Sequence, residues 1–146
     1  MPDCLRVSLQ DSIAVALPPD EAFRLFTPRG EEAWAVDWRP RCHAPAADDS
    51  LPGTSFEIAR HDHVSTWVVV HREPGRLIEY AWLAPGERAA ALSVALAPSG
   101  DGGTRATVTY HMTSLVPEAN PAVQTFATSY REFLDYWQSA IADALG

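Results

Sequence analysis

Residues 120–145 read NPAVQTFATSYREFLDYWQSAIADAL, and this stretch predicts one long amphipathic helix at the end of the chain. Asn120 is a good N-cap residue and Pro121 suits the first helical position, so two residues mark the start. Apolar residues recur at steps of three and four, on one stripe: Val123, Phe126, Ala127, Tyr130, Phe133, Leu134, Trp137 and Ile141. Burying each Phe-sized side chain contributes roughly 1.5–3 kcal/mol, so the stripe must lie against another layer.

A series of strand-like runs before the helix predicts that layer. We expect strands at 5–17, 54–61, 64–73, 76–84, 87–98 and 104–115, and an edge strand at 39–46. Pro74-Gly75 and Pro85-Gly86 stand where a type II turn requires Pro and Gly. Strands joined by such short turns pair as antiparallel neighbours.

Two short helices are expected after the first strand. The first runs from Asp20 to Phe26, and Thr27-Pro28 opens the second, which ends at Trp34. The predicted fold is α+β in a single domain, residues 1–146. It is a curved antiparallel sheet of six to seven strands wrapped on the C-terminal helix, an arrangement that tends to enclose a pocket.

The composition narrows the class of partner. The chain has 146 residues and a net charge of -8, which argues against nucleic acid or an anionic membrane surface as the main partner. No secretion signal and no apolar run of about 18 residues is present, so we expect no membrane insertion and a cytoplasmic location. Cys4 and Cys42 are expected to be free thiols, with a disulfide between them as the alternative.

The turns also predict which residues share a face of the sheet. With two-residue loops at both Pro-Gly pairs, Val68 lies opposite Ala81, and Glu79 lies opposite both Val70 and Leu92. One face then holds Thr66, Val68, Val70, Leu77, Glu79, Ala81, Leu83, Leu92, Val94 and Leu96. We favour it as the helix-facing side, because the large residues of the 87–98 strand would otherwise face solvent.

The opposite face would then carry an aromatic cluster formed by Trp67, Tyr80 and Trp82. Outside the core, such an apolar patch suggests a homodimer interface. A one-residue change in either loop inverts the assignment, and the cluster would then line the cavity.

Several motifs support a resemblance to a known family. They are Phe26-Thr27-Pro28-x-Gly30-Glu31-x-x-Trp34, Asp37-Trp38-x-Pro40, Pro52-Gly53-Thr54-x-Phe56, Ile78-Glu79-Tyr80 and Gly103-Thr104-Arg105-x-Thr107-Val108-Thr109-Tyr110. Over essentially its whole length the chain resembles the START-like SRPBCC superfamily, which has the helix-grip fold, near its polyketide cyclase/dehydrase-type members. The resemblance implies a cavity for lipids, polyketides, hormones or other apolar molecules, in which some members catalyse cyclisation or dehydration.

The candidate site residues follow from the face assignment and the resemblance. Glu79 is the candidate acid or base, because an apolar pocket raises the pKa of a carboxyl group. The alternatives are an outward salt bridge to Arg72 or Arg88 and a buried Glu held by a structural partner. The expected ligand-binding residues are Trp34, Trp38, Phe56, Glu79, Tyr110, Phe126 and Tyr130. The resemblance implies that the two tryptophans belong to a cavity mouth or lid, with simple packing of the second short helix onto the sheet as the alternative. The two tyrosines are expected to meet across the cavity.

No metal or cofactor is predicted. The run His61-Asp62-His63 invites a metal interpretation, but it lies at an expected hairpin tip, where such residues commonly face solvent. Gly100, Gly102 and Gly103 lie in a hairpin loop without the following helix that a phosphate site needs.

The leading hypothesis is therefore a protein that binds a small, largely apolar ligand, lipid-, polyketide- or aromatic-like, between sheet and helix. One alternative is a cyclase, aromatase or dehydratase with Glu79 as acid or base. Another is an interaction module of the co-chaperone or stress-response type that uses the aromatic cluster.

Overall fold

The computed structural model describes residues 3–60 and 63–146. The strands are β1 (Arg6–Val15), β2 (Arg41–Cys42), β3 (Ser55–Arg60), β4 (His63–Glu73), β5 (Leu77–Ala84), β6 (Arg88–Pro98) and β7 (Thr104–Ser114). The helices are α1 (Pro19–Ala22), η1 (Phe23–Phe26), η2 (Gly30–Ala33), η3 (Pro117–Ala119), α2 (Asn120–Thr128) and α3 (Tyr130–Leu145).

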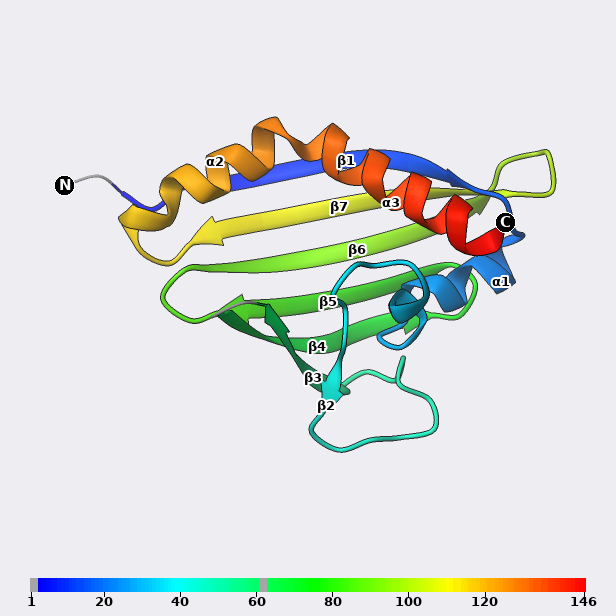
Figure 1. Ribbon diagram of the computed structural model, residues 1–146, viewed down its shortest axis with the longest axis horizontal. Coiled ribbons are helices and arrows are strands. Elements are labelled where there is room, and N and C mark those ends of the chain that lie inside the picture. The colour runs from blue at the N-terminus through cyan, green and yellow to red at the C-terminus, as the bar shows by residue number, and fades with distance from the viewer. Residues whose placement is uncertain (1–2, 61–62) are drawn as a thin grey trace.

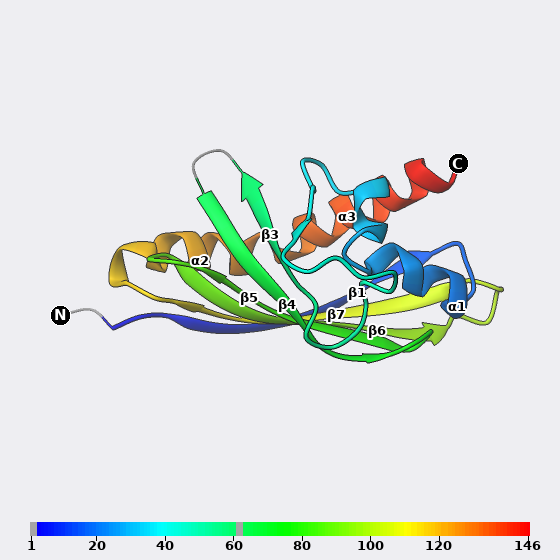
Figure 2. The same cartoon turned by 90° about the horizontal axis from the view of Figure 1, so that it is seen from below.

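The seven strands form one antiparallel sheet in the order β1-β7-β6-β5-β4-β3-β2, which places the first strand beside the last (Figure 1). Figure 2 shows α2, α3 and the short helices on one side of this sheet, with β3 and β4 curving up toward them. The predicted helix-grip architecture is confirmed.

The C-terminal helical segment differs from the prediction in one respect, because it consists of two consecutive helices. The break is at Ser129, which has φ -102° and ψ 14°. Just before it, the Thr128 hydroxyl donates to the carbonyl oxygens of Gln124 and Thr125. Such back-bonding competes with the helix and bends it. Figure 1 shows the change of direction between α2 and α3.

Asn120 does not act as the predicted N-cap. It lies inside the first turn of α2, after η3, and Ala119 occupies the capping position. Its side chain instead accepts hydrogen bonds from the Leu5 amide and the Ser114 hydroxyl and donates to the Asp3 carbonyl. Asn120 therefore ties the helix to the end of the β1–β7 pair where β1 begins and β7 ends.

The prediction of two-residue loops is wrong at both turns. Ala84 pairs with Arg88, so the β5–β6 loop has three residues, and Tyr80 instead of Glu79 lies opposite Leu92. The β4–β5 loop also has three residues, but a bulge at Val70 compensates for it. The bulge preserves the predicted partners of Val68 and removes Val70 from the place opposite Glu79.

This shift inverts the predicted faces of β4 and β5, whereas Leu92, Val94 and Leu96 of β6 lie on the helix-facing side as predicted. The helix-facing side holds Trp67, Val69, Ile78, Tyr80, Trp82, Leu92, Val94 and Leu96, most of them buried. The aromatic cluster thus belongs to the core, and Tyr80 is only 1% exposed. The prediction that it forms an outward dimer patch is wrong, because these rings fill the space under the helices.

No helix in the described part of the chain is both long enough and apolar enough to cross a membrane. Cys4 is exposed and Cys42 half-buried, and both are free thiols.

Candidate functional site

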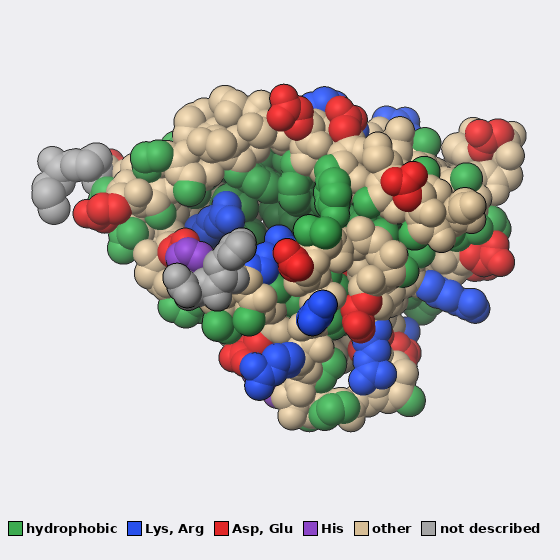
Figure 3. Space-filling view, in the orientation of Figure 1, with side chains coloured by type: hydrophobic (Ala, Val, Ile, Leu, Met, Phe, Trp, Pro, Cys, Tyr) green, Lys and Arg blue, Asp and Glu red, His purple; other side chains and the backbone are tan. Residues whose placement is uncertain are grey.

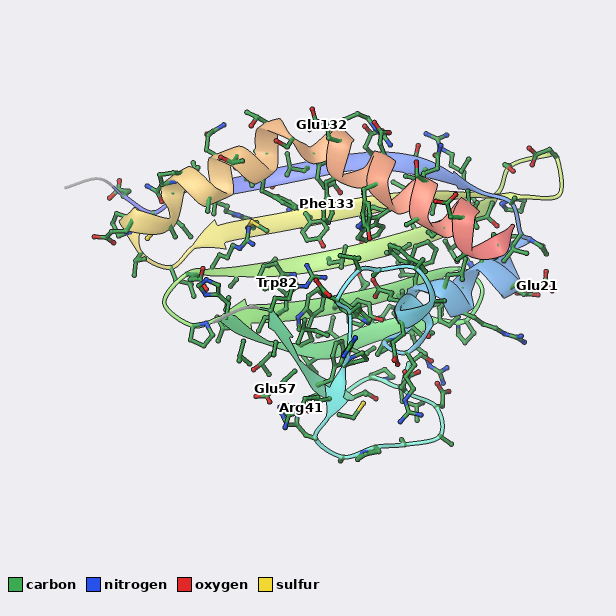
Figure 4. The ribbon with its side chains drawn as sticks, viewed as in Figure 1. Glu21, Arg41, Glu57, Trp82, Glu132 and Phe133 are labelled. Atoms are coloured by element: carbon green, nitrogen blue, oxygen red, sulfur yellow. The ribbon has the colours of Figure 1, made fainter. Side chains whose placement is uncertain are left out.

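A cavity of about 360 Å³ lies between the sheet, the segment that contains η2, and helices α2 and α3. Figure 3 shows this hollow beneath the helices, with hydrophobic side chains at its floor and basic side chains at its edge. Its walls are rich in aromatic residues and include all five tryptophans of the chain: Trp34, Trp38, Trp67, Trp82 and Trp137. Figure 4 shows that the walls come from both layers, with Trp82 on β5 and Phe133 on α3.

Tyr110 of β7 stands at the centre of the contact between sheet and helices. Its ring packs against Phe126 at a centroid distance of 5.0 Å, Phe133 at 5.9 Å and Tyr130 at 6.0 Å. The structure shows no hydrogen bond from its hydroxyl to any residue that it describes. Burial raises the pKa of Tyr110, with a smaller contribution from the carboxyl group of Glu31. The hydroxyl is therefore a neutral group that faces the cavity and is free to bind a ligand.

The segment between η1 and residue 38 closes one side of the cavity and is held by three aromatic donors. The Trp34 indole donates to the Leu25 carbonyl at 2.8 Å. The Trp38 indole donates to the Pro28 carbonyl at 2.6 Å, and the Tyr80 hydroxyl reaches the Phe26 carbonyl from the sheet. These bonds give a physical reason for the tryptophans in the motifs quoted above.

Gly30 allows this segment to turn tightly. A Cβ atom at this position would lie 1.6 Å from the carbonyl oxygen of Arg24, a backbone atom. The Thr27 hydroxyl links the two sides, since it donates to that same carbonyl and accepts from the Gly30 amide. The close approach places Glu31, the next residue, against the core.

Glu31 is the titratable residue that the sequence reasoning missed. Its side chain lines the cavity and is 6% exposed. Loss of hydration on burial raises its pKa well above the ordinary value, and the nearby charge of Arg60 opposes this only in part. The carboxyl group makes no hydrogen bond within the described residues. The sequence gives little indication that Glu31 is buried, because Glu31 and Glu32 are adjacent and only the course of η2 decides which one is buried.

The mouth of the cavity combines exposed apolar side chains with polar links. Val36, Val64 and Tyr136 are 66%, 47% and 44% exposed, and all three line the cavity. The Val36 amide donates to the Tyr136 hydroxyl at 2.9 Å, which joins the η2 segment to α3. Beside it, His63 of β4 pairs with Glu87 of the β5–β6 loop at 2.8 Å.

The predicted site residues fall into three groups. Trp34, Trp38, Tyr110 and Phe126 line the cavity. Phe56 lies behind the wall, where its ring stacks on Trp67, and Tyr130 is anchored by a hydrogen bond to the Val108 carbonyl at 2.7 Å. Neither belongs to the lining, although the rings of Tyr110 and Tyr130 are in contact as expected.

Glu79 forms the third group, and its predicted position on the helix-facing side is wrong. It pairs with His71 and Ser93 in the sheet and lies on the face opposite to the cavity. The three-residue loop before β6 is the cause. Neither predicted arginine pairs with it, since Arg72 binds Asp48 at 3.0 Å and Arg88 faces the cavity.

A metal site is not formed by the described residues, which contain no suitable group of three or more His, Cys, Asp or Glu side chains. His61 and Asp62, two members of the run considered above, lie outside the described residues.

Solved structures with the same fold include an uncharacterised protein from Rhizobium leguminosarum, with a TM-score of 0.72, 16% identity and 97% of each chain covered. Norcoclaurine synthase from Thalictrum flavum has a TM-score of 0.67 and 11% identity, over 97% of this chain and 87% of that one. CalU16 from Micromonospora echinospora has a TM-score of 0.61 and 16% identity, over 96% and 87%.

No curated protein matches the sequence. Residues 6–139 match the model of the family described as polyketide cyclase / dehydrase and lipid transport. The match covers nearly the whole domain, including the strands, the η2 segment and most of α3 that form the cavity. The chain therefore belongs to the polyketide cyclase / dehydrase and lipid transport family.

Proposed function

We propose that this protein binds one small, largely apolar molecule in the cavity between the sheet and helices α2 and α3. The observation that carries the proposal is the composition of the walls, where aromatic rings surround a few polar groups. Those groups include Glu31, Tyr110 and Arg88. Ligand sites typically combine an apolar lining with a small number of polar groups that fix orientation.

The size of the cavity supports a compact ligand. Its volume of about 360 Å³ is near the lower end of the range of ligand pockets, roughly 300–1,000 Å³. An aromatic or short polyketide-like molecule suits it better than a long lipid chain. The exposed apolar residues at the mouth give such a molecule an apolar path inward.

Phenylnaphthylamine, a neutral apolar dye whose fluorescence rises in apolar sites, is a suitable probe. We expect it to bind with a stoichiometry of one per chain. Ala35→Trp should weaken binding at least about tenfold, because Ala35 is half-buried and lines the cavity, so a larger side chain obstructs it.

Ala33→Trp is the matched control. Ala33 is exposed and lies two residues away, outside the lining, so this variant should bind the dye like the wild type. Absence of binding by the wild type, or equal binding by Ala35→Trp and Ala33→Trp, would contradict the proposal.

A second candidate function is acid–base catalysis of the cyclase or dehydratase type, and the position of Glu31 favours it. A carboxyl group with a raised pKa and the free hydroxyl of Tyr110 share one cavity. Such a pair suits proton transfer to and from an apolar substrate that contains carbonyl groups. Glu31 takes the role that the sequence assigned to Glu79.

The test uses Glu31→Gln with Glu32→Gln as its control, because Glu32 is the exposed neighbour. Dehydration of β-hydroxyketones, followed by mass spectrometry, should be lost in Glu31→Gln and kept in Glu32→Gln, while both variants bind phenylnaphthylamine. Equal turnover by the two variants would exclude Glu31 as the acid or base.

A further inference from the structure

Arg88 is a cavity residue whose binding capacity is largely unused. It is the first residue of β6, and its backbone pairs with Ala84 on one side and Ser114 on the other. Its side chain lines the cavity, with the guanidinium carbon 5.5 Å from the ring centroid of Trp82. A cation over an indole face is an attractive arrangement that fixes the guanidinium against the wall.

The guanidinium lacks a strong acceptor. It carries five N–H donors, and its one side-chain partner within the described residues is the Met112 sulfur at 3.7 Å, a weak acceptor. No described Asp or Glu lies within salt-bridge distance of it. Arg72 and Arg131, in contrast, both bind aspartates.

A second unsatisfied donor lies next to it. The indole nitrogen of Trp82 is buried and has no hydrogen-bond partner, the one such side-chain atom found among the described residues. A buried donor without an acceptor costs about 1–3 kcal/mol. The wall of the cavity around Arg88 therefore holds more donors than acceptors, although the indole nitrogen itself is not open to the cavity.

The charged residues that line the cavity also leave Arg88 without an acidic partner. Its charged lining residues include Arg60, Arg88 and Glu87, and Glu87 is already paired with His63. Burial favours the neutral form of Glu31. Arg88 thus has no ion-pair partner among the described residues, although the whole chain has a net charge of -8.

We propose that the ligand of this cavity carries an anionic oxygen group, such as a carboxylate or an enolate, and that Arg88 binds this group. The inference rests on the ligand-binding function proposed above and adds the chemical class of the ligand. The planar guanidinium suits two-oxygen groups, because it donates two parallel hydrogen bonds to them. The apolar body of the ligand would lie against the tryptophan walls, with the anionic group at the β5–β6 end.

Two dyes that differ by one anionic group test this proposal. Anilinonaphthalene sulfonate has the same aromatic body as phenylnaphthylamine plus a sulfonate. We expect the wild type to bind the sulfonate at least about tenfold more tightly than the neutral dye. This preference would run against the overall negative charge of the protein, which repels an anion.

Arg88→Gln should remove the preference, so that the ratio of the two affinities falls from at least about tenfold to about one. Arg88→Met is the second variant, because an unbranched apolar side chain retains the packing on Trp82 if Arg88→Gln does not fold. Arg76→Gln is the matched control, since the Arg76 side chain is 79% exposed and lies outside the cavity.

The outcomes separate this inference from the proposed function. Failure of the neutral dye to bind would contradict the ligand-binding function itself. Binding of the neutral dye without any preference for the sulfonate would overturn only the assignment of an anionic ligand. A preference that persists in both Arg88 variants, or that is lost equally in Arg76→Gln, would also overturn it.

Discussion

Tyr80 and Phe26 are joined by a hydrogen bond of 2.6 Å from the tyrosine hydroxyl on β5 to the phenylalanine carbonyl at the end of η1. The bond is fully buried and connects residues that are 54 positions apart in the chain. It fixes the η1–η2 segment to the sheet, and that segment carries Glu31 and two tryptophans of the cavity wall.

Tyr80→Phe should therefore lower the free energy of unfolding by about 1–3 kcal/mol, because the Phe26 carbonyl loses its buried donor. Tyr136→Phe removes a hydrogen bond at the exposed cavity mouth, and its cost should be smaller, about 0.5–1.5 kcal/mol. Urea unfolding of both variants measures the difference. Equal losses would show that burial of the Tyr80 hydrogen bond does not increase its contribution to the free energy of unfolding.

Gly30→Ala should destabilise the protein by more than about 2 kcal/mol, because the new methyl group collides with the Arg24 carbonyl. Gly53→Ala is the comparison. Gly53 has φ +91° and open space around it, so alanine there costs only the backbone strain, about 1–2 kcal/mol. Thermal unfolding of both variants tests the ranking, and the reverse order would contradict the tight η1–η2 turn.

Glu31→Gln should change how stability depends on pH. The folded-state pKa of Glu31 is raised above its ordinary value of 4.5. Below that value the carboxyl group is protonated in both states. As the pH rises above it, the unfolded chain ionises first, so the wild type loses stability by up to about 1.4 kcal/mol per pH unit until the folded carboxyl group also ionises.

The glutamine variant lacks this loss and should exceed the wild type in stability at neutral and mildly alkaline pH. The pKa values of three aspartates, Asp11, Asp48 and Asp101, are lowered. Their ionisation changes stability at lower pH, and it does so equally in the wild type and the variant. The free energy of unfolding, measured from pH 4 to 8 for wild type, Glu31→Gln and Glu32→Gln, isolates the contribution. Parallel curves for all three would mean that Glu31 is not buried.

Glu79→Gln should leave both stability and dye binding nearly unchanged, with an effect within about 0.5 kcal/mol. The residue is half-buried on the outer face, opposite to the cavity. Leu92→Ala, at the adjacent inward position of the sheet, should cost about 2–5 kcal/mol. A large loss of dye affinity in Glu79→Gln would favour the register predicted from two-residue loops.

The sequence sufficed to predict the strands, the short helices and the C-terminal helical layer, because each depends on local periodicity and turn residues. The faces could not be predicted in the same way. Pro85-Gly86 is compatible with loops of two or three residues, and the difference of one residue moves Glu79 from the inner face to the outer one. The bulge at Val70 has no signal of its own among consecutive valines.

The cavity lining was predicted only at positions with large aromatic side chains. Trp34 and Trp38 line the cavity as expected. Glu31 and Arg88 depend on long-range packing, through the Gly30 turn and the β5–β6 loop. Charged residues at such positions look like surface residues in a sequence, so the charged part of the cavity became visible only with the structure.

The indole N–H signals of the five tryptophans give the most direct test of the central claim, because all five line the cavity. Nuclear magnetic resonance spectra recorded during titration with phenylnaphthylamine should show these signals shifting to saturation at one equivalent. The backbone amides of His71 and Ser93, on the outer face, should stay in place. Unchanged indole signals, or shifts confined to the outer face, would contradict ligand binding in this cavity.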